Sequence, residues 1–503
     1  MQFALGLDVG TQGVKALLVD AHGAIAASAS APLSTIDGLP QGHSEQHPAD
    51  WLAAIDRCLA RLRDTHDLGT IVAIGVSGQQ HGLVPLDAEH RVIRPAKLWN
   101  DVASALECAA IVAAVGGPDA LFARTGNALP PGFTAGKVAW LRNHEPEHFA
   151  RLRHVLLPHD YVNLHLTGTL GCEAGDASGT GVFDVRARRF DDVVCEATAP
   201  GLRAMLPPLV DAGTAIGALR VAFAARHGLR EGIPVATGGG DNMMAAIGSG
   251  AVRDGIAVVS LGTSGTVFAS TTQPICDPGG EVAAFCDSAG GWLPLGCTMN
   301  ATVATEVTRG MFAASLDAFE SAIGATHAGA AGVLCVPYFT GERSPDLPTA
   351  TGAFLGLTPS NASAANVLRA AVEGATFAIA RLFHRLVGLG VTVDEVRLTG
   401  GGSRSPTWCR IVAAALDRPV ALGVPADAAA YGAATQAWWT LRRIAEPALA
   451  LATVVDGFAG AHPLQRIAPD PTDAALYRTR LSDFCAVVDA LAPTFPRIGR
   501  QPL

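Results

Sequence analysis

Two acidic residues stand beside glycine-rich turns, where they could act on phosphate groups. Asp8 ends the apolar stretch LGLDVG and precedes a turn formed by Thr11, Gln12 and Gly13, while Asp241 comes directly after three glycines. A carboxylate can accept a proton from an alcohol or hold Mg²⁺ through water, and glycine turns offer backbone N–H groups to phosphate oxygens. The alternatives are an ordinary hairpin turn for Asp8 and a helix N-cap for Asp241.

The first glycine turn returns in the second half of the chain. Residues 256–270 read IAVVSLGTSGTVFAS, in which a hydrophobic strand leads into Gly262, Thr263 and Ser264 before a second strand follows. Two hairpins with the same pattern indicate a chain built from two similar halves. Triple glycines also follow apolar strands at 238–240 and at Gly400, Gly401 and Gly402. Each turn alone is compatible with a simple strand–helix connection, but four at matching places are unlikely to arise by chance. Together they resemble the two phosphate-binding hairpins and the adenosine loop of the actin-like ATPase fold.

Length and composition limit the kind of protein. A chain of 503 residues is too long for a single hydrophobic core and has the length of two domains. A hydrophobic content of 49% with 16% charged residues argues against disorder. The net charge of −9, with no long basic run, argues against nucleic acid and anionic membranes as partners, but it does not exclude a phosphorylated ligand. The ten cysteines are scattered without a CxxC pair, and the start has no signal-peptide pattern. We therefore expect a reduced, cytoplasmic protein.

Strand and helix patterns alternate along both halves. The expected strands are 3–9, 14–19, 71–76, 155–157, 233–237, 256–261, 265–269, 333–336 and 396–399. The expected helices are 49–63, 102–115, 135–143, 363–388, 406–416, 428–443 and 473–490. Such alternation predicts an α/β fold with mixed sheets flanked by helices. We expect an N-terminal domain over 1–247, a C-terminal domain over 248–503 and a ligand cleft between them.

One stretch imitates a nucleotide-binding loop. PGFTAGKVAW at 131–140 contains the Gly136-Lys137 pair of a P-loop. However, Gly132 is one position closer to this pair than the P-loop pattern requires, and Val138 replaces the required Ser or Thr. This stretch is therefore not a P-loop.

Longer motifs give the chain a family resemblance. GFTAGKVAWLRNH (132–144) and GAFLGLTPSNASAANVLRAAVE (352–373) resemble the two signatures of the FGGY carbohydrate kinase family. Within that family, SEQHP, GQQHG, LWND, VLLPHDYV, PVATGGGDN and PYFTGERSP are most similar to the kinases that phosphorylate D-xylulose, the xylulokinases. The resemblance runs to about residue 445. It implies two actin-like ATPase (ribonuclease H-like) domains that close over ATP and a sugar.

The resemblance also implies a role for each candidate residue. Asp241 would be the general base and Asn242 a sugar contact, while Asp8 would hold Mg²⁺ through water. The phosphates and adenosine of ATP would lie against the three glycine turns, that is, Thr11, Gln12, Gly13, Gly262, Thr263, Ser264, Gly400, Gly401 and Gly402. Because Asp241 stands at a helix start, we expect the helix N-terminus to favour its ionised form.

The expected sugar pocket departs from the family pattern in two places. Gln80 and His81 match the sugar-binding pair, but the usual residue before the histidine is Met. Asp101 matches a sugar contact in a W-x-D-x-R pattern, whereas Ala103 replaces its arginine. These changes alter polar matching to the substrate, which governs discrimination strongly. D-ribulose or a pentitol is thus an alternative substrate, a non-catalytic nucleotide sensor is a rival function, and a homodimer is left open.

Overall fold

The N-terminal sheet is built around the hairpin that carries the first glycine turn. In the computed structural model, which describes residues 1–498, β1 (Phe3–Val9) pairs antiparallel with β2 (Gly13–Asp20), and β2 pairs with β3 (Ile25–Pro32). On its other side β1 runs parallel to β5 (Ile71–Gly78). The strand order is β11-β12-β5-β1-β2-β3, with β13 also paired to β5. The other strands of this sheet are β11 (Ala215–Ala218), β12 (Pro234–Ala236) and β13 (Gly239–Gly240).

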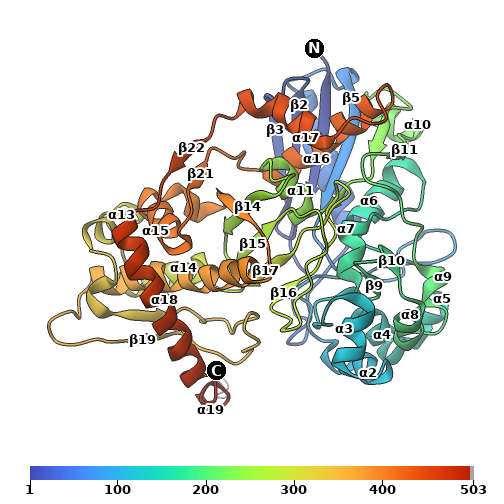
Figure 1. Ribbon diagram of the computed structural model, residues 1–503. Helices are drawn as coiled ribbons and strands as arrows, with labels where there is room; N and C mark the ends of the chain where they lie inside the picture. The colour runs from blue at the N-terminus through green and yellow to red at the C-terminus, as the bar shows by residue number, and fades with distance from the viewer. Residues whose placement is uncertain (499–503) are drawn as a thin grey trace.

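Helices cover both faces of this sheet, and one of them comes from the far end of the chain. α1 (Pro48–Arg63) packs against β2 and β3, while α16 (Ala428–Arg443) packs against β1, β2 and β5. Figure 1 shows α16 and α17 (Leu451–Phe458), in orange-red, over the blue strands of the N-terminal sheet. The contact is close because Gly6 and Gly75 lack side chains: an added Cβ would lie 1.9 Å and 2.0 Å from the carbonyl oxygens of Ala430 and Ala433.

The C-terminal sheet repeats the same plan. β14 (Gly255–Leu261) and β15 (Gly265–Ala269) form the second hairpin, and β14 runs parallel to β20 (Val393–Thr399). The strand order is β16-β17-β15-β14-β20-β21-β22. The other strands are β16 (Val282–Ala283), β17 (Leu295–Thr298), β21 (Val420–Leu422) and β22 (Gln465–Ile467). The helices are α12 (Thr302–Met311), α13 (Leu316–Ala325), α14 (Ala364–Gly388), α15 (Pro406–Leu416), α18 (Pro471–Leu491) and α19 (Phe495–Ile498).

The remaining helices and short strands of the N-terminal half lie outside the strands of its main sheet. Its helices are α2 (Ala105–Ala114), α3 (Pro118–Thr125), α4 (Thr134–His144), α5 (Pro146–Arg151), α6 (Pro158–Thr167), α7 (Ala174–Ala177), α8 (Asp192–Thr198), α9 (Leu202–Met205), α10 (Val221–His227) and α11 (Asp241–Gly248). Its short strands are β4 (Glu45–Gln46), β6 (Val84–Leu86), β7 (Ala96–Lys97), β8 (His154–Leu156), β9 (Phe183–Asp184) and β10 (Arg189–Phe190).

The predicted α/β class with mixed, helix-flanked sheets is confirmed. Two expected strands, 155–157 and 333–336, lie outside the main sheets, because β8 pairs with β6 and β18 (Leu334–Val336) pairs with β19 (Ala353–Leu355). The domain division at 247–248 stays a prediction. Over residues 1–498 no single helix is long and apolar enough to cross a membrane, although the bent pair α2 and α3 passes that test together.

Candidate active site

The strand register brings Asp8 and Asp241 to one edge of the N-terminal sheet. Asp8 on β1 lies opposite Ser77 on β5, and Ser77 lies opposite Gly239 on β13. Asp241 follows that short strand by one residue and opens α11. The Ser77 hydroxyl donates to Asp8 Oδ1 at 2.8 Å. Two acids far apart in the sequence therefore share the carboxyl ends of neighbouring strands, where ligands of open α/β sheets bind.

Asp241 has an unusual affinity for its proton. Burial, together with the neighbouring Asp8 and Asp176 carboxylates, raises the pKa of Asp241 to about 7. Hydrogen bonds from the backbone N–H and Nδ2 of Asn242 to Oδ1, at 2.8 and 3.0 Å, act in the opposite direction. The expectation that the helix start favours the ionised form is thus wrong, since burial beside other acids outweighs the helix N-terminus. Burial also raises the pKa of Asp8.

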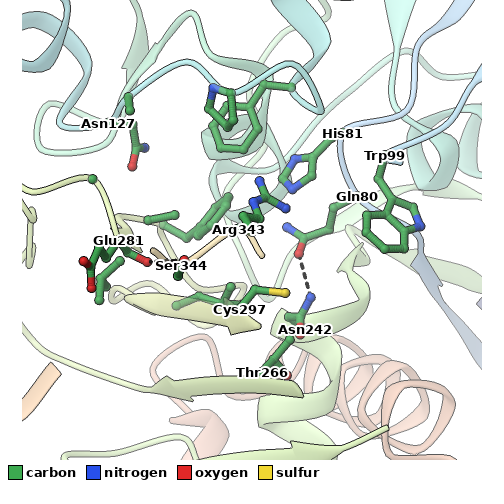
Figure 2. A pocket seen from close by; sticks show the side chains of 18 of the residues that line it. Gln80, His81, Trp99, Asn127, Asn242, Thr266, Glu281, Cys297, Arg343 and Ser344 are labelled. Atoms are coloured by element: carbon green, nitrogen blue, oxygen red, sulfur yellow. Dashed lines mark hydrogen bonds between the residues drawn. The ribbon is translucent and has the colours of Figure 1, made fainter. Parts of the chain in front are cut away.

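A cavity of about 630 Å³ lies over this edge and is lined by both halves of the chain. From the first half it receives Gln80, His81, Trp99, Asp241 and Asn242, together with the segment around Phe133. From the second half it receives Ser260, Gly262, Ser264, Thr266, Cys297, Arg343 and Ser344. Figure 2 shows several of these side chains around the opening. Asp241 and the second glycine turn thus line one cavity.

Gln80 and Asn242 are hydrogen-bonded to each other inside this cavity. Asn242 Nδ2 donates to Gln80 Oε1 at 3.0 Å, the dashed line in Figure 2, and also to Asp241 Oδ1. The amide has two N–H groups, so both are used and its oxygen is left as an acceptor. Gln80 Nε2 lies 3.3 Å from the Met243 sulfur.

His81 is held firmly and in one protonation state. Its backbone is left-handed, with φ of 62°, and its ring stacks on Phe133 with centroids 4.6 Å apart. Lys137, the residue of the false P-loop, donates to the His81 carbonyl at 2.7 Å. Burial and then the Lys137 charge lower the pKa of His81 well below its ordinary value. His81 Nδ1 lies 3.1 Å from the Gly179 carbonyl and must donate to it, so the neutral ring leaves Nε2 as an acceptor.

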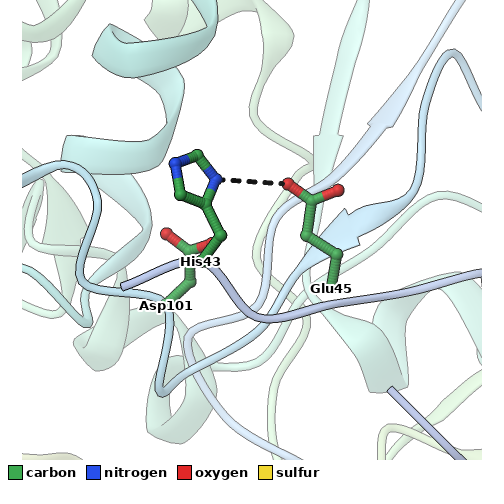
Figure 3. Close-up of side chains that lie close together, drawn as sticks. All are labelled: His43, Glu45 and Asp101. Carbon is green, nitrogen blue, oxygen red and sulfur yellow. Dashed lines mark ion pairs between the residues drawn. The ribbon is translucent and has the colours of Figure 1, made fainter. Parts of the chain in front are cut away.

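Asp101 occupies a different environment. Its carboxylate is fully buried, and Oδ2 accepts from the Ser44 backbone N–H at 2.9 Å and from Lys97 Nζ at 3.0 Å. His43, Glu45 and Asp101 lie close enough together to hold a metal ion (Figure 3). However, Lys97 Nζ is 3.3 Å from His43 Nδ1 and 3.3 Å from Glu45 Oε1, so the ammonium already supplies the positive charge.

The glycine turns are ordered by their neighbours. The start of α12 donates to the second turn, from the Ala301 N–H to the Thr263 carbonyl (3.1 Å) and from the Thr302 N–H to the Gly262 carbonyl (2.9 Å). Gly400 has φ of 83°, and a Cβ there would lie 2.9 Å from the Gly262 nitrogen. The triple glycine of the second half therefore packs directly against the second turn.

The cavity lining separates the predicted residues into two groups. Gln80, His81, Asp241, Asn242, Gly262 and Ser264 line it. Outside its lining lie Asp8, Thr11, Gln12, Gly13, Asp101, Thr263, Gly400, Gly401 and Gly402. Trp99 and Arg343 line it without having been singled out, although both belong to stretches, LWND and PYFTGERSP, that carry the family resemblance. The site roles of all these residues stay predictions.

The two α/β halves, each with a glycine hairpin, and the cavity that both halves line define a protein with the two-domain actin-like fold. Residues 3–248 match the N-terminal domain, and residues 257–441 the C-terminal domain, of the FGGY family of carbohydrate kinases. The chain therefore belongs to the FGGY family of carbohydrate kinases.

Several proteins named as xylulose kinases are similar over most of the chain. A xylulose kinase of Haemophilus influenzae is 38% identical over 443 residues, which cover 86% of this chain and 90% of that protein. A xylulose kinase of Escherichia coli is 36% identical over 412 residues, covering 81% and 84%. The crystal structure of a "xyloylose kinase" from Brucella ovis matches with a TM-score of 0.90 at 36% identity, over 98% of this chain and 100% of that one.

Proposed function

We propose that this carbohydrate kinase transfers the γ-phosphoryl group of ATP to D-xylulose and forms D-xylulose 5-phosphate. The observation that carries the proposal is the single cavity that holds Asp241, the Gln80–Asn242 pair and the second glycine turn. The similarity to xylulose kinases over most of the chain supports the choice of sugar. In this arrangement the sugar contacts the N-terminal half and the phosphates contact the hairpins.

Asp241 is suited to accept the proton of the sugar hydroxyl. Asn242 occupies Oδ1 of Asp241 with two donors, which leaves Oδ2 for the hydroxyl proton. A pKa of about 7 matches a base that works near neutral pH. As the hydroxyl oxygen bonds to the γ-phosphorus, the bond from that phosphorus to the bridging oxygen breaks, ADP leaves, and the proton passes to Asp241.

The same edge fits Mg²⁺. Mg²⁺ prefers carboxylate oxygens and retains several waters, and the Asp8 side chain uses only Oδ1 in hydrogen bonds with the described residues. Asp8 would hold the ion, which would neutralise phosphate charge when bound. Thr11, Gln12, Gly13, Thr263, Gly400, Gly401 and Gly402 remain the proposed nucleotide contacts.

On the sugar side of the cavity, two side-chain atoms are left to accept hydrogen bonds. His81 Nε2 and the Asn242 amide oxygen can each accept from a sugar hydroxyl, and the Gln80 side chain borders the same space. Asp101 as a sugar contact stays a prediction, and the same holds for a cytoplasmic location and for a homodimer.

A substrate panel tests the proposal. Purified protein with Mg-ATP is offered D-xylulose, D-ribulose and pentitols, and ADP release is measured for each. We expect the highest kcat/KM with D-xylulose. A preference for D-ribulose or a pentitol would refute the choice of sugar, and ADP release indifferent to every sugar would favour a nucleotide sensor.

A further inference from the structure

A closed ring of hydrogen bonds ties the first glycine turn to the end of β5. The Thr11 hydroxyl lies 2.9 Å from Gln79 Oε1, Gln79 Nε2 lies 3.1 Å from Gln46 Oε1, and Gln46 Nε2 lies 2.7 Å from the Thr11 carbonyl. Gln46 and Gln79 are buried. Two indole groups donate into this ring, Trp51 Nε1 to Gln46 Oε1 at 2.9 Å and Trp99 Nε1 to Thr11 Oγ1 at 3.0 Å.

The Trp51 indole decides which atom donates and which accepts in every hydrogen bond of the ring. An indole nitrogen can only donate, so the Gln46 atom that faces Trp51 is its oxygen. Gln46 Nε2 then donates to the Thr11 carbonyl, and Gln79 must present its amide nitrogen to Gln46. Gln79 Oε1 therefore faces Thr11, so that the single hydroxyl proton of Thr11 is donated to Gln79.

This assignment changes what the Thr11 side chain can do. A threonine hydroxyl has one proton, and here that proton is committed inside the protein. The hydroxyl is thus not available as a donor to phosphate, and the first turn retains its backbone N–H groups for that purpose. The side chain of Thr11 instead accepts from Trp99, whose ring lines the cavity proposed for the sugar.

We propose that Trp99 and Thr11 are positioning residues that couple the sugar pocket to the phosphate-binding hairpin. A sugar that packs against Trp99 fixes the indole, the indole fixes the Thr11 hydroxyl, and the ring fixes the tip of the turn between β1 and β2. Gln79 also directly precedes Gln80 and His81, so the ring connects to the sugar side by a second route. Sugar and nucleotide then strengthen each other's binding, as linkage requires of any such coupling.

The inference rests on the proposed sugar kinase function and is tested by binding rather than by turnover. The sugar Kd is measured calorimetrically with and without Mg²⁺ and a non-hydrolysable ATP analogue, using D-xylulose or whichever sugar the panel selects. In the wild type we expect the analogue to tighten sugar binding by about 5-fold or more, the lower range of typical coupling. Trp99→Phe, which keeps the ring but removes the N–H, reduces that factor to below about 2-fold.

Matched variants separate coupling from loss of structure. Thr11→Val removes the hydroxyl and loses the coupling, whereas Thr11→Ser retains the hydroxyl and keeps it. Trp439→Phe makes the same chemical change as Trp99→Phe, but the Trp439 indole donates to the Leu449 carbonyl, away from the ring and outside the cavity lining, so the coupling factor stays at its wild-type value. The double variant Trp99→Phe/Thr11→Val loses no more than either single variant, because both act on one contact.

The outcomes distinguish this inference from the proposed function. A wild-type coupling factor near one, wild-type coupling in Trp99→Phe, or equal loss in Thr11→Ser and Thr11→Val would each overturn the inference. Failure of the wild type to bind D-xylulose while it phosphorylates another sugar would refute only the proposed substrate. If Thr11→Val does not fold, Trp99→Phe and Thr11→Ser still decide the question.

Discussion

Asp241→Asn should make the protein more stable and nearly inactive at the same time. Asn has nearly the shape of Asp241 but carries no charge, so it removes both the proposed proton acceptor and the negative charge beside Asp8. General-base catalysis contributes about 10²–10⁴-fold in rate, and we expect kcat to fall by that factor. The nucleotide contacts proposed above do not include Asp241, so ATP binding should persist.

The gain in stability follows from the pKa. In the unfolded chain Asp241 ionises near 3.8 and in the folded protein near 7, and this difference corresponds to about 4 kcal/mol at ~1.4 kcal/mol per pH unit. A raised carboxyl pKa destabilises the fold progressively as pH rises from 3.8 to about 7, and the full cost applies above that range. Asp241→Asn should therefore raise the free energy of unfolding by up to about 4 kcal/mol at pH 8 and by less than half of that at pH 5.

Urea unfolding of both proteins at pH 8 and pH 5 measures this difference, and ADP release measures kcat. The control is Asp37→Asn, which neutralises an exposed loop acid and should change neither quantity. An Asp241→Asn protein no more stable than the wild type at pH 8, or a gain that is the same at both pH values, would refute the electrostatic reasoning. Undiminished kcat would refute the role of Asp241 as base.

Three further predictions concern the surroundings of the site. The kcat/KM for the sugar should rise with pH through an inflection near 7, where free Asp241 ionises, and a flat profile between pH 5.5 and 8 would contradict this. Lys137→Met should raise the sugar KM more than it lowers kcat, because the donor to the His81 carbonyl is lost, and steady-state kinetics with Lys137→Arg as the conservative comparison checks this. Gly6→Ala should destabilise the fold by about 1–3 kcal/mol or more, because its Cβ would collide with the α16 backbone. Thermal unfolding measures this change, and Gly401→Ala is the control because a Cβ at Gly401 meets nothing within 4 Å.

The glycine turns and the motifs predicted much of the fold and part of the site. The two hairpins were predictable because a strand, a glycine turn and a second strand are adjacent in sequence. Gln80, His81, Asp241 and Asn242 were predictable as a set because they stand in motifs, and they do line one cavity.

What could not be predicted depends on contacts between distant segments. The raised pKa of Asp241 comes from burial and from Asp8 and Asp176, none of which the local sequence around a helix start contains. The commitment of the Thr11 hydroxyl to Gln79 requires β4, β5 and β7 to meet at the hairpin. The helical pattern of 428–443 predicted α16 but not that its small residues would lie on the first sheet.

The position of α16 has a consequence for folding of the chain during its synthesis. Ala4, Leu17 and Val19 are covered by a helix that leaves the ribosome only after more than 400 further residues. Until then one apolar face of the first sheet lacks the helix that covers it, and exposed apolar surface of this kind favours aggregation. Nonsense truncations before Ala428 should accordingly yield insoluble fragments rather than a free-standing first half.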